Sequence, residues 1–152
     1  MTIDQNSVPL HILLADDDMD DRTFFDKALR EIPITTKLST VNNGEQLMDW
    51  LFGNADGLPD VLFLDLSMPR KTGFECLAEI KENEKLRSLT VIMLTTSFTR
   101  GIDLEDNLIS TLSKMGAEAY IRKPIDFSVL KQVIHQTLIK VEEKMRSGSE
   151  EN

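Results

Sequence analysis

The sequence is poor in cysteine and has no long apolar run. Its single cysteine, Cys76, excludes a disulfide framework and favours a reducing compartment. No apolar stretch approaches the length that spans a membrane, and the polar residues 1–9 lack the apolar core of a signal peptide. We therefore expect a soluble cytoplasmic protein with a flexible N-terminus over residues 1–9.

Basic residues are also few. The chain has 17 Lys and Arg against 26 Asp and Glu, which gives a formal net charge of -9. Nonspecific binding to a nucleic-acid backbone depends on clustered Lys and Arg, and no five-residue basic cluster occurs here. We predict no direct contact with nucleic acid and no insertion into a membrane.

Short apolar runs predict five strands. Residues 61–64 (VLFL) have the composition of a strand that is buried on both faces, and Asp65 follows them directly. A carboxylate at the end of a buried strand is costly unless it is paired, protonated or bound to a cation. The other predicted strands are residues 10–15 (LHILLA), 36–41 as a weaker edge strand, 91–94 (VIML) and 119–122 (AYIR).

Apolar residues at helical spacing follow each of these strands. Asn42 and Asn43 precede Glu45 and Gln46 at the spacing of a helix cap, and Gly116 stands where the fourth helix should end. Alternating strands and helices predict an α/β fold with a parallel sheet and helices on both faces. One domain is expected over residues 10–146, followed by a polar, disordered tail at 147–152.

Polar residues follow four of the predicted strands and should meet at one edge of the sheet. Asp16 and Asp17 follow the first strand, Asp65 the third, Thr95 the fourth and Lys123 the fifth. Carboxylates about 4 Å apart repel by about 4 kcal/mol per pair at an effective dielectric constant near 20. They need a divalent cation, a shared proton or a lysine, and a set of oxygen ligands favours Mg²⁺ over zinc.

This combination of groups suits phosphoryl transfer to a carboxylate. Asp65 is the candidate nucleophile, the cation and Lys123 can neutralise the phosphoryl oxygens, and Thr95 can hydrogen-bond the product. No other side chain is an obvious general base for fast turnover. We therefore predict a phosphoacceptor and not an efficient enzyme.

The acidic run over residues 16–21 has a second interpretation. Its later members are expected to begin the first helix, where negative charge is favourable. An EF-hand loop is excluded, because Asp21 occupies the sixth position, where glycine is needed, and no glutamate stands at the twelfth. Only Asp16 and Asp17 follow the strand directly.

These motifs resemble the receiver domain of bacterial two-component response regulators. The resemblance extends from about Leu10 to Val141. It depends on the acidic pair, the segment 64–73 (LDLSMPRKTG), Thr95 after VIML, and residues 120–124 (YIRKP). It implies a flavodoxin-like, doubly wound sheet of strand order 2-1-3-4-5.

The resemblance also implies roles for single residues. Asp65 would be phosphorylated by a sensor histidine kinase or a hybrid kinase and phosphotransfer protein, and Thr95 and Tyr120 would form a switch pair. Lys123 would contact the carboxylate or phosphoryl group, and its bond to Pro124 would be cis. The Mg²⁺ ligands would be Asp17, Asp65 and the carbonyl group of Ser67, with assistance from Asp16.

With no effector domain after the fifth helix, the chain is most similar to the single-domain regulators that partner phytochrome-type or hybrid sensor kinases. Such a regulator signals by docking to a protein and is a monomer, or a homodimer through the fourth helix, fifth strand and fifth helix. The segment between Thr95 and Tyr120 is about six residues longer than usual. Residues 97–106 are therefore expected to form an extended loop or a longer fourth helix.

Two alternatives share the strand-end aspartate. A haloacid-dehalogenase-like phosphatase needs a second aspartate two residues after the nucleophile, and Ser67 stands there. A degenerate receiver, which binds partners without phosphorylation, would lack one or more site residues, all of which are present here.

Overall fold

The computed structural model describes residues 8–95 and 102–150 and contains a five-stranded parallel sheet. The strand order is β2-β1-β3-β4-β5, as the family resemblance implied. The strands are β1 (Leu10–Ala15), β2 (Thr36–Val41), β3 (Val61–Asp65), β4 (Val91–Thr95) and β5 (Ala119–Arg122). The predicted edge strand, residues 36–41, is β2 and pairs only with β1.

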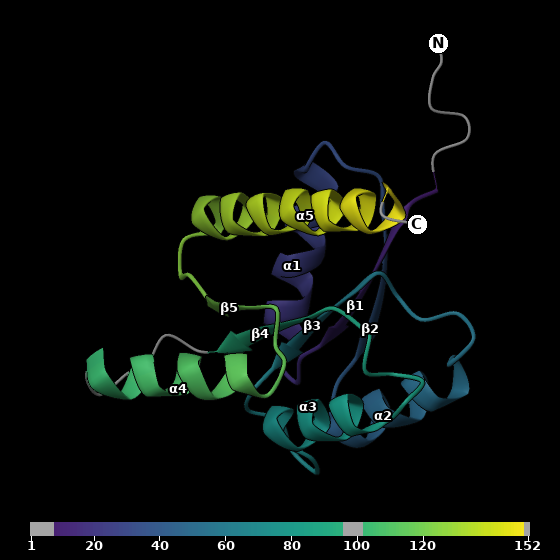
Figure 1. Ribbon diagram of the computed structural model, residues 1–152. Helices are drawn as coiled ribbons and strands as arrows, with labels where there is room; N and C mark the ends of the chain where they lie inside the picture. The colour runs from purple at the N-terminus through teal and green to yellow at the C-terminus, as the bar shows by residue number, and fades with distance from the viewer. Residues whose placement is uncertain (1–7, 96–101, 151–152) are drawn as a thin grey trace.

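Five helices cover the two faces of the sheet. In Figure 1, α1 and α5 lie on one side, and α2, α3 and α4 lie on the other. The helices are α1 (Met19–Glu31), α2 (Gly44–Gly53), α3 (Gly73–Glu82), α4 (Ile102–Lys114) and α5 (Phe127–Glu150). This is the doubly wound arrangement expected from alternating strands and helices.

Alternation along the strands divides the core into two layers. In β3, Val61 and Phe63 pack among the residues of α1 and α5, whereas Leu62 and Leu64 pack among those of α2 and α3. Phe63 contacts Phe25 of α1 edge to face, with 5.0 Å between the ring centroids. The apolar composition of residues 61–64 therefore follows from burial on both faces.

Local capping explains where α2 and α3 begin and where α4 ends. The side chain of Asn43 accepts a hydrogen bond from the backbone N–H of Gln46, as the sequence spacing predicted. Thr72 and Glu75 form a capping box at the start of α3. Gly116 follows α4 with a φ angle of 103°, which glycine adopts at little cost.

Two of the expected segments lie only partly within the described residues. Helix α5 continues to Glu150, so residues 147–150 of the expected disordered tail are helical in the structure, whereas 151–152 lie outside the described residues. These four residues contain no proline, and because each residue added to an existing helix gains a hydrogen bond, the helix can continue over Ser and Gly although both are weak helix formers. Of residues 97–106, the part from Ile102 onward is helical and the part before 102 lies outside the described residues, as do residues 1–7.

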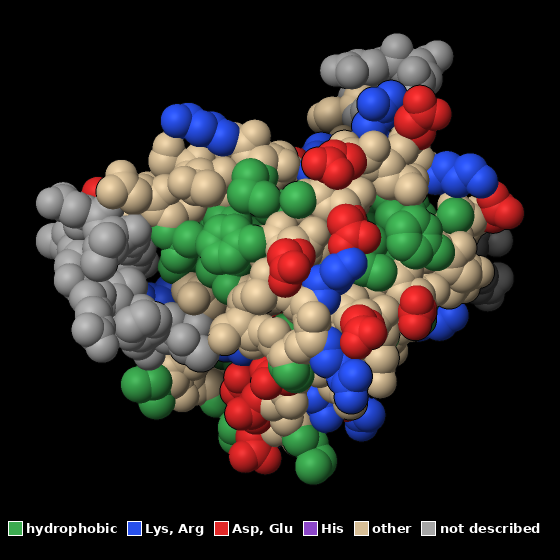
Figure 2. All heavy atoms as spheres, turned by 90° about the horizontal axis from the view of Figure 1, so that it is seen from below, with side chains coloured by type: hydrophobic (Ala, Val, Ile, Leu, Met, Phe, Trp, Pro, Cys, Tyr) green, Lys and Arg blue, Asp and Glu red, His purple; other side chains and the backbone are tan. Residues whose placement is uncertain are grey.

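Charged side chains of both signs are interspersed on the face of the molecule that α2 and α3 cover. Figure 2 shows this face, on which the described residues form no continuous basic patch. Among the described residues, no helix is both long and apolar enough to cross a membrane.

Gly73 lies where the connection after β3 packs tightly against the strand end. A Cβ atom at this position would lie 2.3 Å from the carbonyl oxygen of Asp65 and 2.8 Å from the Cα atom of Leu66. The backbone N–H of Gly73 also donates to the carbonyl oxygen of Leu66 at 3.0 Å. The backbone that carries Asp65 therefore requires glycine at this point.

We expect Gly73→Ala to lower the free energy of unfolding by about 1 to 3 kcal/mol, because the added methyl group must displace backbone atoms. Urea unfolding of the variant measures this loss. Gly57→Ala is the matched control, since a Cβ atom there meets nothing within 4 Å, and we expect a change of no more than about 0.5 kcal/mol. Equal stability of the two variants would contradict the tight packing at Gly73.

Candidate functional site

Three charged residues at strand ends point to the same side of the sheet. Asp16 continues the alternation of Ile12 and Leu14 in β1, and Asp65 continues that of Phe63 in β3. These apolar residues belong to the layer of α1 and α5. Lys123, two residues after the buried Ile121, reaches the same side.

The ammonium group of Lys123 joins these carboxylates. Its Nζ atom lies 2.8 Å from Oδ2 of Asp16 and 3.1 Å from Oδ2 of Asp65. The backbone N–H of Lys123 donates to the carbonyl oxygen of Thr95 at 2.7 Å, which holds the start of the β5–α5 connection beside β4. The predicted convergence of Asp16, Asp65 and Lys123 is therefore present.

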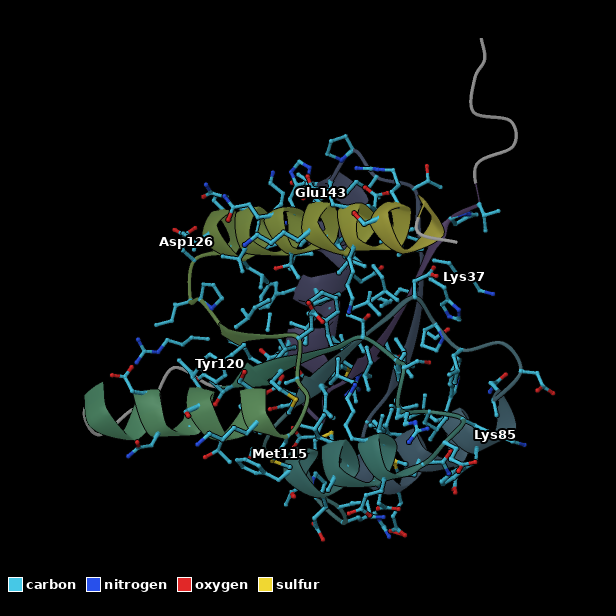
Figure 3. The ribbon with its side chains drawn as sticks, in the orientation of Figure 1. Lys37, Lys85, Met115, Tyr120, Asp126 and Glu143 are labelled. Carbon is cyan, nitrogen blue, oxygen red and sulfur yellow. The ribbon has the colours of Figure 1, made fainter. Side chains whose placement is uncertain are left out.

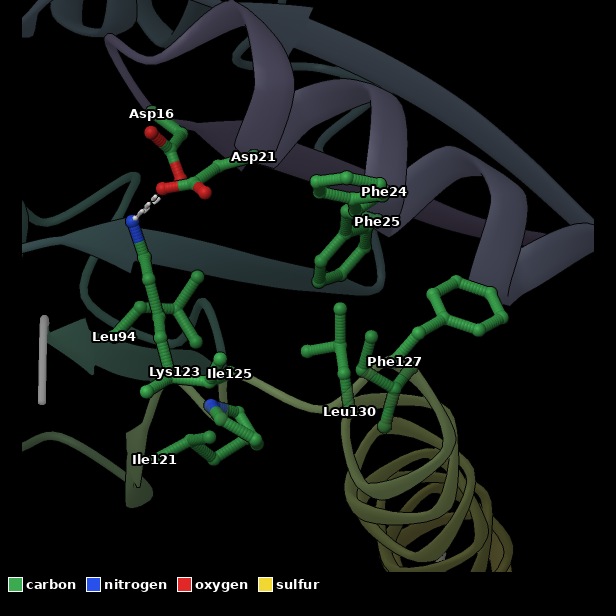
Figure 4. A pocket seen from close by; sticks show the side chains of 12 residues that line it. Asp16, Asp21, Phe24, Phe25, Leu94, Ile121, Lys123, Ile125, Phe127 and Leu130 are labelled. Atoms are coloured by element: carbon green, nitrogen blue, oxygen red, sulfur yellow. Dashed lines mark hydrogen bonds and ion pairs between the residues drawn. The ribbon is translucent and has the colours of Figure 1, made fainter.

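Lys123 has a third partner that sequence reasoning missed. Oδ2 of Asp21, in the first turn of α1, lies 2.9 Å from Nζ of Lys123 (Figure 4). The later members of the acidic run were expected to do no more than begin this helix, and Asp18 does so by accepting a hydrogen bond from the N–H of Asp21. Asp21 could have been recognised as a candidate site residue because it lies in the first turn of the helix that follows β1, whose end carries Asp16.

Burial shifts the pKa values of the carboxyl groups in the site. The exposed fraction is 1% for Asp16 and 2% for Asp65. Burial raises the pKa of Asp65 to about 6, although the charge of Lys123 and the N–H of Ser67 act to lower it. Burial also raises the pKa of Asp16, against the hydrogen bonds from Lys123 and the N–H of Asp18.

The pKa of Lys123 changes in the opposite direction to what burial alone would cause. Burial disfavours the ammonium ion, but the hydrogen bond and charge of Asp16 and the charge of Asp65 outweigh this effect. The pKa is therefore raised, and Lys123 stays charged at neutral pH. A permanent positive charge is thus held beside two buried carboxyl groups.

Asp16, Asp17 and Asp65 form a group that could hold a metal ion. Each offers one carboxylate oxygen, and these oxygens lie within 4.8 Å of one another. Asp17 is exposed and opens the group to solvent, whereas Asp16 and Asp65 are buried. Backbone N–H groups orient the buried pair: that of Ser67 donates to Oδ1 of Asp65 at 3.1 Å, and that of Asp18 donates to Oδ1 of Asp16 at 3.0 Å. An all-oxygen set fits a hard cation.

Thr95 and Tyr120 lie on the other side of the sheet from Lys123. Thr95 continues the alternation of Val91 and Met93, which belong to the layer of α2 and α3. Tyr120 is partly buried and packs against the same layer, between β5 and α4 in Figure 3. The predicted switch pair therefore lies on the α4 side, and Ser67 is exposed after β3.

The Lys123–Pro124 bond differs from the expectation. No peptide bond in the described part of the chain is cis, so this bond is trans. The trans form is the intrinsically preferred one, by about 0.5 to 1 kcal/mol before proline.

A small apolar cavity adjoins the charged groups. It has a volume of about 90 Å³ and lies between α1, the β5–α5 connection and α5. Figure 4 shows Phe24, Phe25 and Leu130 on its wall, with Asp21 and Lys123 at one end. Apolar side chains therefore line the space beside Asp21 and Lys123.

We expect Asp65→Asn to raise the free energy of unfolding by about 1 to 3 kcal/mol at pH 7 without divalent cations, because it removes a buried negative charge. The raised pKa means that wild type gains the same relief by protonation, so the advantage should shrink as pH falls from 7 to 4. Added Mg²⁺ should stabilise wild type more than the variant. Urea unfolding with and without Mg²⁺ measures these effects.

The exposed Asp56→Asn is the control for charge alone, and it should change stability by no more than about 0.5 kcal/mol. If Asp65→Asn destabilises the metal-free protein at pH 7, burial of the carboxylate is not the dominant cost in this site.

Comparison with known proteins identifies the family. The response regulator receiver domain matches residues 12–135. Response regulator Rcp1 of Synechocystis sp. is 31% identical over 124 residues, which cover 79% of this chain and 80% of that protein.

Solved structures agree with this match. The phosphorylated cyanobacterial phytochrome response regulator RcpA has a TM-score of 0.72 at 30% identity, covering 86% of this chain and 91% of that one. The Mn²⁺-bound form of Rcp1 has a TM-score of 0.71 at 26% identity, covering 84% and 91%. The fold, the strand-end residues and these similarities together show that the chain belongs to the response regulator receiver domains of two-component signalling.

Proposed function

We propose that this protein is a phosphorylation-switched response regulator that accepts a phosphoryl group on Asp65 from a histidine kinase. The observation that carries the proposal is the setting of Asp65. It is buried at the end of β3, within 3.1 Å of a charged lysine, and beside two further carboxylates that offer oxygens to a cation. The phosphorylated state of the similar protein RcpA supports the proposal.

Transfer of the phosphoryl group to Asp65 forms one bond and breaks one, and it needs no general base. An oxygen of the Asp65 carboxylate forms a bond to phosphorus, and the bond from phosphorus to the imidazole nitrogen of the kinase histidine breaks with its electron pair left on that nitrogen. The imidazole leaves as a neutral ring when its other nitrogen carries a proton. Ionised Asp65 is the nucleophile, so no proton need be removed from it. Lys123 is placed to neutralise the charge that the phosphoryl oxygens bring.

Asp16, Asp17 and Asp65 would hold Mg²⁺, with the carbonyl group of Ser67 as a further ligand. Bound Mg²⁺ supplies positive charge to the phosphoryl oxygens. The all-oxygen ligand group supports this assignment, as does the Mn²⁺ found in Rcp1, since both ions prefer oxygen ligands.

The acyl phosphate is a signalling state in this proposal, not an intermediate of fast turnover. Ser67 stands two residues after Asp65, where a haloacid-dehalogenase-like phosphatase requires its acid and base. The protein would therefore be no efficient enzyme, and its phosphoryl group would be lost slowly by hydrolysis.

The output is docking to a protein partner. The Thr95 hydroxyl would bond the phosphoryl group and draw Tyr120 with it, which changes the face formed by α4, β5 and α5. Tyr120 packs on the α4 side of β5, and this position supports such a coupling. The same face would form a homodimer where the protein is not a monomer. Two states that differ by a few kcal/mol suffice for the switch.

Incubation with Mg²⁺ and acetyl phosphate, followed by intact-mass measurement, tests the proposal. We expect wild type and Asp56→Asn to gain one phosphoryl group, and Asp65→Asn to gain none, because the amide is not a nucleophile. EDTA added before the donor should prevent the gain. Equal modification of Asp65→Asn would place the acceptor elsewhere, and no modification together with no binding of beryllofluoride would support a degenerate receiver.

A further inference from the structure

Asp21 is the contact of Lys123 that the proposed transfer does not use. It lies at the third position of α1, where the hydrogen bond from its N–H to Asp18 fixes the start of the helix. From there its carboxylate reaches Lys123 at 2.9 Å across the end of the sheet. The contact joins α1 to the β5–α5 connection, two segments about 100 residues apart in the sequence.

The ammonium group has no donor to spare. It carries three N–H bonds, and Nζ lies within 3.1 Å of an oxygen from each of Asp16, Asp21 and Asp65. A phosphoryl group on Asp65 would add negative charge and oxygens that accept hydrogen bonds. One donor already points to Asp65 and can pass from its carboxylate oxygen to a phosphoryl oxygen. Any further bond from Lys123 to the phosphoryl group must replace its contact with Asp16 or with Asp21.

Of the two partners that stay ionised after phosphorylation, Asp16 and Asp21, Asp21 is released at the lower cost. Its side chain is 38% exposed, whereas those of Asp16 and Asp65 are 2% and 3% exposed. Water can replace the ammonium group at Asp21, but a buried carboxylate that loses its partner stays unsatisfied. We therefore expect Lys123 to give up its contact with the more exposed carboxylate, that of Asp21, first.

We propose that Asp21 is a positioning residue that competes with the phosphoryl group for Lys123 and so lowers the affinity of the site for that group. The inference rests on the proposed function, because it concerns the same lysine and the same phosphoacceptor. While Asp65 is unmodified, Asp21 holds the ammonium group toward α1. When the phosphoryl group arrives, the ammonium group leaves Asp21 for it.

The same geometry has the opposite effect on a divalent cation. Lys123 shares Asp16 and Asp65 with the candidate cation group, so its charge opposes a cation there. By drawing Lys123 toward α1, Asp21 reduces this opposition. Loss of the Asp21 carboxylate should therefore favour the phosphoryl group and disfavour the cation, a split that a loss of folding would not produce.

Beryllofluoride, which mimics the phosphoryl group, provides an equilibrium test in ¹⁹F NMR titrations at saturating Mg²⁺. We expect Asp21→Asn to bind it about three to ten times more tightly than wild type, the range for loss of one partly exposed charge contact. Titration of Asp21→Asn with Mg²⁺ alone should give an affinity about two- to threefold weaker than that of wild type. Asp21→Glu keeps the charge and should bind beryllofluoride within about twofold of wild type.

Asp20→Asn is the matched control. Asp20 lies one residue earlier in the same first turn of α1, is exposed and carries the same charge, but it is not among the contacts of Lys123. It should bind beryllofluoride within about twofold of wild type. Thermal unfolding of each variant shows whether it folds, and Asp21→Ser replaces Asp21→Asn if the latter does not.

The titrations distinguish a failure of the competition by Asp21 from a failure of the proposed phosphoacceptor function. If wild type binds beryllofluoride and Asp21→Asn binds it no more tightly than Asp20→Asn, competition by Asp21 is refuted and the phosphoacceptor stands. Parallel loss of both affinities would likewise refute it and show a structural role for Asp21. If wild type itself gives no bound ¹⁹F resonance, the proposed function fails first and the inference fails with it.

Discussion

The pairing of one lysine with buried carboxylates is the interaction on which the site depends. Asp16 and Asp65 are almost fully buried, and burial raises the pKa of each. Lys123 offsets this cost only if the β5–α5 connection brings its side chain over the ends of β1 and β3. The hydrogen bond from its N–H to Thr95 and the parallel pairing of β4 with β5 meet this requirement. The position of the edge strand β5 thus determines whether the buried carboxylate at the end of the central strand β3 has a positively charged partner.

The sequence predicted most of this arrangement because it depends on simple periodicities. Alternation with period two assigns Asp65 to the face of Phe63, and parallel strands bring their ends to one edge. Asp16, Asp17, Asp65, Thr95 and Lys123 could all be found from their positions at the carboxyl ends of the apolar runs. The strand order itself came from the family resemblance, since alternation alone does not order the strands.

Other features depend on geometry that no such pattern encodes. Asp21 reaches Lys123 because Asp18 begins α1 where it does, and six consecutive residues with five acids do not reveal which carboxylate faces the site. The continuation of α5 over residues 147–150 could not be predicted either. Polar residues typical of a disordered tail can also continue a helix that has already formed. Local composition was a poor guide where a neighbouring element determines the conformation.

The division of the site between the two faces of the sheet has a consequence for signalling. Lys123 and Asp21 lie on the side of α1 and α5, whereas Thr95 and Tyr120 belong to the side of α4. A phosphoryl group on Asp65 would attract Lys123 on one side and Thr95 on the other. Movement of Lys123 would release a contact to α1, and movement of Thr95 would act on β5 and α4. On the proposed function, a single modification would bias two separate surfaces, because the lysine and the hydroxyl group that would contact it belong to different layers of the fold.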